Sequence, residues 1–208
     1  MPKKRNKAGT RKVNKKIIIV CEGAKDKSES AYFKELKRCC FFASNEIEVI
    51  IQDTETNTGK ELVKIANSYR DKIYKDIDEA WVVYDKDGYS KHAETFDYAK
   101  HHNVKIAFSS ISFETWILLH FGYTTRAFDK SENIISYLKH TYNFDYYKSD
   151  YDTFNKIKDK TETAIANAKK VNKFIMEGYP NSKIYELNPY TDVYKLIEEL
   201  LSFKIHNL

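Results

Sequence analysis

The sequence predicts an α/β protein with a mostly parallel four-stranded sheet flanked by helices and followed by a helical annex. Three observations support this. Short apolar runs rich in β-branched residues alternate with amphipathic stretches over residues 17–122, which is typical of parallel β-α-β units. Beyond residue 122 the apolar residues follow helical spacing. Residues 1–16 contain no apolar run. We therefore expect a basic tail (1–16), an α/β domain (17–122) and a helical annex packed on it (123–208).

Four apolar runs are long enough to be strands, and each is followed by a polar turn. The expected strands are Ile17–Cys21, Glu46–Ile51, Ala80–Tyr84 and Val104–Phe108. Helical spacing between them predicts helices over Ser30–Arg38, from Thr58 to Ile73, and over residues 91–102. Thr58 is the expected N-cap, with Glu61 three residues on completing a capping box.

The chain is expected to be helical from Phe113 onwards, at the end of the α/β domain and through the annex. Residues 113–121 are strongly apolar, and residues 131–140 are amphipathic. A long helix is predicted over Lys160–Glu177, ended by Gly178 and Pro180. The last helix should begin near Thr191–Asp192 and extend to Leu201.

Composition predicts a soluble cytoplasmic protein. With 208 residues and 42% hydrophobic content, the chain can bury one core and a smaller lobe. No segment approaches the roughly 20 apolar residues of a membrane span. The three cysteines, Cys21, Cys39 and Cys40, do not match the spacing of zinc ligands or redox pairs, so we interpret them as buried thiols in a reducing compartment.

The excess positive charge is concentrated in the first 16 residues. Eight basic side chains and no acid occur there, and because the whole chain has a formal net charge of +5, the remainder is net acidic. Such a tail either serves solubility alone or attracts the phosphates of a nucleic acid. The candidate phosphate-binding residues in this segment are Arg5, Arg11, Lys12, Lys15 and Lys16.

Acidic residues follow three of the four predicted strands. Glu22 follows the first strand, Asp85 and Asp87 follow the third, and Glu114 opens the helix after the fourth. Ligands of open α/β sheets bind beyond the carboxyl ends of the strands, so these carboxylates should meet at one edge. Like charges this close repel each other unless a cation lies between them. Oxygen-only ligands favour Mg²⁺ or Mn²⁺ over zinc.

Each motif also has a purely structural interpretation. An Asp-x-Asp-Gly string such as residues 85–88 is common in turns, where Asp bonds its own backbone. Gly23 and Gly88 would let the chain turn sharply after the acids. Gly59–Lys60 lacks the remaining residues of a phosphate-binding loop, so no nucleoside triphosphatase is predicted. His120 lies in an apolar helix and is best interpreted as a core histidine.

The combination of a Glu after the first strand and an Asp-x-Asp after the third resembles the Toprim domain of topoisomerases, primases and OLD-type nucleases. The whole chain more closely resembles the RloB family, over about residues 11–201. The strings that carry this resemblance are IIIVCEG (17–23), KSESAYF (27–33), WVVYDKD (81–87), SFETWILLHF (112–121) and NPYTDV (188–193).

The resemblance implies a bacterial antiphage role, often beside an RloA-type or OLD-like ATPase, with Glu22, Asp85, Asp87 and Glu114 in the site. The loop after Gly23 is about two residues longer than is usual for the family, so either Glu29 or Asp26 takes the second acidic place. We favour Glu29, because it keeps its spacing to Tyr32 and Phe33.

The function expected from these features is Mg²⁺- or Mn²⁺-dependent cleavage of phosphodiester bonds in RNA, such as tRNA, or in DNA. Glu22, Asp85 and Asp87 would hold the metal, with Glu29 or Glu114 completing a second position. Lys25 and Lys27, together with the tail, would bind the flanking nucleic-acid backbone. Two alternatives stay open: a non-enzymatic Toprim-like module that binds nucleic acid or a partner ATPase, and a phosphoryl-transfer enzyme acting on small nucleotides.

Overall fold

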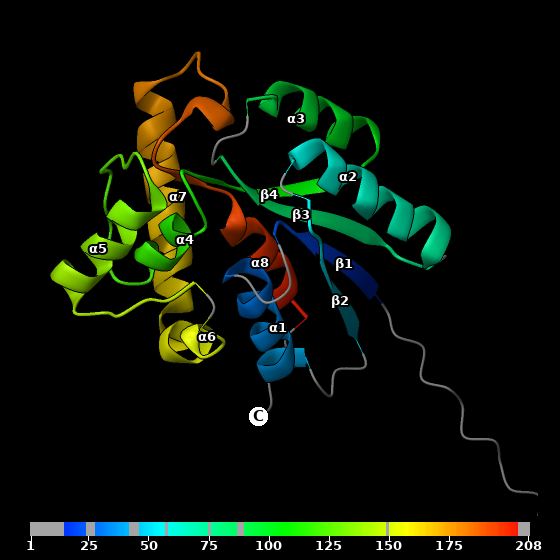
Figure 1. Ribbon diagram of the computed structural model, residues 1–208, viewed down its shortest axis with the longest axis horizontal. Coiled ribbons are helices and arrows are strands. Elements are labelled where there is room, and N and C mark those ends of the chain that lie inside the picture. The colour runs from blue at the N-terminus through cyan, green and yellow to red at the C-terminus, as the bar shows by residue number, and fades with distance from the viewer. Residues whose placement is uncertain are drawn as a thin grey trace, which may run out of the picture.

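The computed structural model describes residues 15–23, 28–41, 46–56, 58–74, 76–86, 90–148 and 150–203. Its sheet has the strand order β2-β1-β3-β4-β5 (Figure 1). The first four strands are parallel: β1 (Lys15–Cys21), β2 (Ile47–Asp53), β3 (Glu79–Asp85) and β4 (Lys105–Ser110). The four predicted strands are therefore confirmed, within one or two residues at their ends.

The expected count of four strands is wrong, because a fifth strand joins the sheet. β5 (Tyr190–Thr191) pairs antiparallel with the end of β4. A strand of two residues is too short to show an alternating pattern, so β5 could not be predicted. β5 and the following helix α8 (Val193–Leu201) contact β4, so this part of the expected annex belongs to the layers of the sheet.

Helices cover both faces of the sheet. Figure 1 shows α2 (Gly59–Ser68) and α3 (His92–His101) on one side and α1 (Ser28–Phe41) with α8 on the other. This burial on two sides explains why β1 is a continuous apolar run, since Ile17 to Cys21 are all fully buried. Among the described helices, none combines the length and the apolar content needed to cross a membrane.

The start of α2 differs from the prediction. Thr58 has an extended backbone and occupies the N-cap position, but its side chain makes no capping hydrogen bond, so the predicted box with Glu61 is wrong. Gly59 follows it and packs closely: a Cβ there would lie 2.8 Å from Thr95 Cγ2 and 3.0 Å from the Tyr84 ring. The tight contact with β3 and α3 fixes this turn. After Ser68 the helix continues as a π-helical turn over Tyr69–Ile73.

The annex consists of helices packed beside the sheet. They are α4 (Glu114–Leu119), α5 (Ser131–Tyr142), α6 (Thr153–Ile157) and α7 (Thr161–Gly178), with 3₁₀ turns at Lys158–Lys160 and Ile184–Glu186. The predicted helices in this region are confirmed. α6 was not predicted, because five residues are too short to show helical periodicity.

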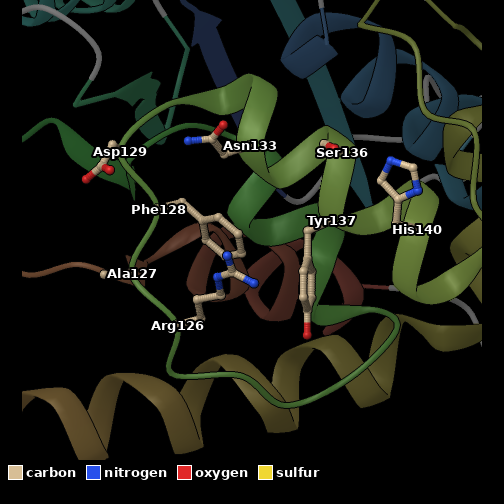
Figure 2. Close-up of a pocket in the computed structure, with 8 residues that line it drawn as sticks. All are labelled: Arg126, Ala127, Phe128, Asp129, Asn133, Ser136, Tyr137 and His140. Atoms are coloured by element: carbon tan, nitrogen blue, oxygen red, sulfur yellow. The ribbon is translucent and has the colours of Figure 1, made fainter.

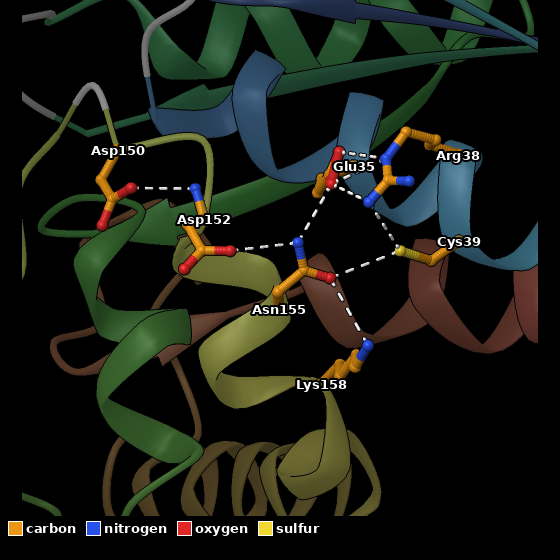
Figure 3. Close-up of polar contacts among 7 residues, drawn as sticks. All are labelled: Glu35, Arg38, Cys39, Asp150, Asp152, Asn155 and Lys158. Carbon is orange, nitrogen blue, oxygen red and sulfur yellow. Dashed lines mark hydrogen bonds and ion pairs between the residues drawn. The ribbon is translucent and has the colours of Figure 1, made fainter.

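Polar contacts fix α6 against α1 (Figure 3). The Asn155 side-chain amide donates a hydrogen bond of 3.0 Å to Glu35, which also binds Arg38. Cys39 lies beside them on the exposed side of α1, with its Sγ 3.5 Å from Asn155 Oδ1. The interpretation of all three cysteines as buried thiols is therefore wrong for Cys39, although Cys21 is fully buried.

Candidate functional site

Glu22 and Asp85 meet at the carboxyl edge of the sheet, as predicted. Cys21 and Val83 are register partners in the parallel strands β1 and β3, so these two strands end side by side. The Glu22 amide donates to the Val83 carbonyl at 3.0 Å, and the Asp85 amide donates to Glu22 Oε2 at 3.0 Å. Gly23 then takes a positive φ of 87°, which turns the chain away from the edge.

Two further predicted acids reach the same place from helices. Glu29 lies in the first turn of α1 and is 8% exposed, and Glu114 opens α4 and is 1% exposed. Both carboxylates interact electrostatically with Asp85. The structure therefore brings together Glu22, Glu29, Asp85 and Glu114, which we call the acidic cluster. Asp87 and the alternative Asp26 lie outside the described residues.

Burial and repulsion from neighbouring acids disfavour ionisation of Glu29 and Asp85. Burial raises the pKa of Glu29 to about 8, and the charges of Glu114 and Glu22 add to this effect. Burial also raises the pKa of Asp85 well above its usual range, and the charges of Glu29, Glu114 and Glu22 contribute. A cation placed among these groups would favour their charged forms.

One oxygen of Asp85 has no visible role in the fold. Asp85 Oδ1 is buried, and no hydrogen-bond partner for it occurs among the described residues. A buried polar atom of this kind is rare in native proteins and often faces a ligand, a water molecule or an ion. The oxygen-only donors of the acidic cluster fit Mg²⁺ or Mn²⁺ by their chemistry. As they stand, however, no three or more Asp, Glu, His or Cys side chains in the described ranges form a group that could hold a metal ion.

Two annex residues that the sequence did not predict contact Glu114. The Tyr146 hydroxyl donates to Glu114 Oε1 at 3.0 Å, and Lys148 Nζ lies 4.0 Å from Glu114 Oε2. Burial raises the pKa of Tyr146 well above its usual range, as does the charge of Glu114, so the phenol remains a proton donor. The segment that carries both residues has no periodicity or motif to distinguish them.

Another acid at the carboxyl edge, Asp53, has a basic partner. Asp53 ends β2, and its carboxylate forms an ion pair of 2.6 Å with Lys34 and accepts a hydrogen bond from Ser30. Asp85 differs from Asp53: no ion pair joins it to a lysine of the described residues, and its charged neighbours there are Glu29, Glu114 and Glu22. An acid at the end of a strand is therefore not a candidate site residue on the basis of its position alone.

Two of the candidate phosphate-binding residues lie away from the acidic cluster. Lys15 and Lys16 begin β1, at the end of the strand opposite to Glu22, so the last two residues of the predicted tail belong to the sheet. Lys15 pairs with Glu79 at 2.6 Å, and Lys16 with Glu48 at 3.3 Å. The other candidates, Arg5, Arg11, Lys12, Lys25 and Lys27, fall in parts of the chain that the structure does not describe.

His120 is a core residue, as interpreted from the sequence. It is buried beside Trp116 and Tyr32, and its Nδ1 is 3.0 Å from the Trp116 carbonyl. Burial lowers the pKa of His120 to about 4, so the ring is neutral at neutral pH. It is therefore an unsuitable proton donor for the acidic cluster.

The fold and the acidic cluster define an α/β protein with buried, crowded carboxylates at the carboxyl edge of a mostly parallel sheet. A sequence profile for the family described as RloB-like protein matches residues 17–200. The chain therefore belongs to the RloB-like family. No curated protein and no solved structure matches it.

Proposed function

We propose that this protein is a metal-dependent nuclease with a Toprim-like site, which cleaves phosphodiester bonds of RNA, such as tRNA, or of DNA in bacterial antiphage defence. The observation that carries the proposal is the acidic cluster: four carboxylates from four separate elements gather around the buried, unpartnered oxygen of Asp85. A structural acid would be expected to have a basic partner, as Asp53 has.

The residues of the cluster divide into two groups by their contacts. Glu22 and Asp85 are anchored at the ends of adjacent strands, and with Asp87 they would hold Mg²⁺ or Mn²⁺. Glu29 would complete a second position after losing its proton. Bound there, a divalent cation would polarise the phosphate and lower the pKa of an attacking water. The Tyr146 hydroxyl holds Glu114 in place from the annex side.

A second candidate function is a non-enzymatic module that binds nucleic acid or an ATPase of the RloA or OLD-like type. One observation favours it: as they stand, the described side chains include no group that could hold a metal ion. In that case Glu114, already bound by Tyr146 and facing Lys148, would serve the fold.

A cleavage assay separates these functions. The protein would be incubated with tRNA, single-stranded DNA and duplex DNA, each with Mg²⁺, with Mn²⁺ and with EDTA. We expect cleavage of at least one substrate that requires the divalent ion and falls by more than about 100-fold in Glu22→Gln, since removal of a metal ligand removes the polarising charge. Glu61→Gln is the matched control, because Glu61 is half exposed on α2 and, among the described residues, forms an ion pair only with Lys64. Equal cleavage by Glu22→Gln would contradict the proposal, and binding without cleavage would favour the module.

A further inference from the structure

Three cations of the annex lie over aromatic rings of the same region of the chain. The contacts are Lys160 over Phe121 (4.4 Å), Lys170 over Tyr123 (4.4 Å), and Arg126 over both Phe128 (5.1 Å) and Tyr137 (5.2 Å). We call these seven residues the cation–aromatic strip. Each distance is within the range of a favourable cation–π contact.

The cations of the strip differ from the other cations that lie over rings. Lys15, Lys60, Lys105, Lys169 and Lys195 also contact rings, and each of them pairs with a carboxylate. Within the described residues, Arg126, Lys160 and Lys170 have no carboxylate within ion-pair distance. The other two arginines there, Arg38 and Arg70, are both bound to acids. The strip thus carries positive charge that the fold leaves available.

Three of the rings beneath these cations are linked through ring contacts, although Phe128 itself is buried. Tyr137 contacts Phe128 at 5.5 Å and Tyr142 at 6.0 Å between ring centres, and Tyr142 contacts Phe121 at 5.5 Å. On the other side, Lys160, Asn167 and Lys170 are spaced seven and three residues apart, which places them on one face of the α7 region. Asn167 fixes this face by donating to the Leu119 carbonyl at 2.9 Å.

A polar pocket adjoins Arg126. Its volume is about 320 Å³, near the lower end for small-molecule sites. Figure 2 shows the Arg126 guanidinium beside Phe128 and Tyr137, with Asn133, Ser136 and His140 along α5. The amide, hydroxyl and imidazole groups can both donate and accept, and Asp129 adds an acceptor. This mixture suits the edge of a nucleobase better than it suits a simple anion.

Helix α5 leads from this pocket to the acidic cluster. Its first residue, Ser131, accepts a hydrogen bond of 3.0 Å from Lys148 Nζ, which is the group that lies 4.0 Å from Glu114. Tyr137 is six residues further on, or about 9 Å along the helix axis. A strand bound at the pocket could therefore reach the acids within a short distance.

We propose that the cation–aromatic strip binds the unpaired nucleotides of a single-stranded nucleic acid, with bases on the exposed Tyr123 ring and in the pocket and phosphates on Arg126, Lys160 and Lys170. Single strands offer bases and phosphates together, whereas the bases of a duplex are already stacked. The strip would orient the strand so that a neighbouring phosphodiester lies at the acidic cluster. This inference deepens the proposed nuclease function and rests on it.

The test is a binding measurement in EDTA, where metal-dependent cleavage cannot occur. Fluorescence anisotropy would compare labelled single-stranded RNA, single-stranded DNA and duplex DNA of equal length. The test variants are Tyr123→Ala, whose side chain is 39% exposed, and Arg126→Ala. Lys105→Ala is the control: it removes the same charge from a ring contact at the amino end of β4, away from the acidic cluster.

We expect each test variant to weaken single-strand binding by about 5- to 100-fold, the range found when a stacking ring is removed, with unchanged melting temperature and little effect of Lys105→Ala. Equal binding by the wild type and both variants would overturn the proposal. The proposal would also be overturned if the wild type bound duplex DNA, or the polyanion heparin as a further probe, as tightly as it binds single strands. Such a result would show attraction to charge without contacts to bases. If the variants lose binding but the wild type cleaves no substrate, the strip stands and the nuclease proposal fails.

Discussion

Two strand-end acids at opposite ends of the sheet, Glu79 and Asp85, have neighbours of opposite charge. At the amino edge, Glu79 pairs with Lys15 at 2.6 Å and with Lys105 at 2.8 Å. At the carboxyl edge, Asp85 lies among Glu22, Glu29 and Glu114, and among the described residues Lys148 lies 4.0 Å from Glu114.

The pKa values of Glu79 and Asp85 shift in opposite directions because of these different neighbours. Burial acts to raise the pKa of Glu79, but hydrogen bonds from Lys105 and Lys15 outweigh it and lower the pKa. Burial and the charges of Glu29, Glu114 and Glu22 raise the pKa of Asp85, and a backbone hydrogen bond from Phe113 only partly opposes them. The comparison indicates that the ion pairs of Glu79 stabilise the folded chain, whereas the acidic cluster costs stability; under the proposed function, this cluster is where a divalent cation binds.

The largest expected effect comes from the same chemical change made at each edge. Asp85→Asn should reduce metal-dependent cleavage by more than about 100-fold and leave the melting temperature equal or higher, because it relieves repulsion. Glu79→Gln should leave cleavage unchanged and cost about 1 kcal/mol, or roughly 2–4 °C, because it unpairs two lysines. Calorimetry and the cleavage assay on both variants check this. Unfolding of Asp85→Asn at room temperature would show that Asp85 is structural.

Stability should fall as pH rises from about 6.5 to 8 without divalent cations. The folded chain holds the proton of Glu29 up to a pKa of about 8, whereas the unfolded chain loses it near 4.5. Raising the pH through this window therefore favours unfolding. The window lies above the range in which His120, with its lowered pKa, has the opposite effect. Melting temperatures at several pH values measure the slope, and Glu29→Gln should flatten it. A slope that is unchanged in Glu29→Gln would assign the effect to other groups.

A smaller effect is expected for Tyr146→Phe. Loss of the hydrogen bond to Glu114 should cost about 1–2 kcal/mol, because a buried acceptor loses its donor. Cleavage should fall but persist, since Tyr146 positions Glu114 and does not touch the Asp85 side of the cluster. Tyr179→Phe is the control, because Tyr179 is 61% exposed at the end of α7. Denaturant unfolding of both variants decides whether the annex contact stabilises the site.

The smallest effect concerns the basic tail. Deleting residues 1–14, which leaves Lys15 and Lys16 in β1, should weaken nucleic-acid binding and flatten its dependence on salt. Cleavage at saturating substrate should survive, because the deleted residues include no acid. Binding isotherms at two salt concentrations compare the two proteins, and identical slopes would assign phosphate contacts to the folded part alone.

Sequence reasoning predicted the edge of the sheet better than it predicted what surrounds that edge. Central strands buried on both faces are continuous apolar runs, so β1, β3 and the meeting of Glu22 with Asp85 could be anticipated. Tyr146 and Lys148 could not, because they reach Glu114 from a segment between α5 and α6 that has no periodicity. The cation–aromatic strip was missed for the same reason, since its rings come from α5 and from the irregular segment before it.

The central claim is that the acidic cluster binds a divalent cation. Calorimetric titration of Mn²⁺ into the wild type and Asp85→Asn tests it most directly, in two buffers of different ionisation enthalpy. We predict that the wild type binds and releases protons at pH 7, because Glu29 must ionise, and that Asp85→Asn binds at least 10-fold more weakly. Absence of binding to the wild type at millimolar Mn²⁺, or equal binding by the variant, would contradict the account.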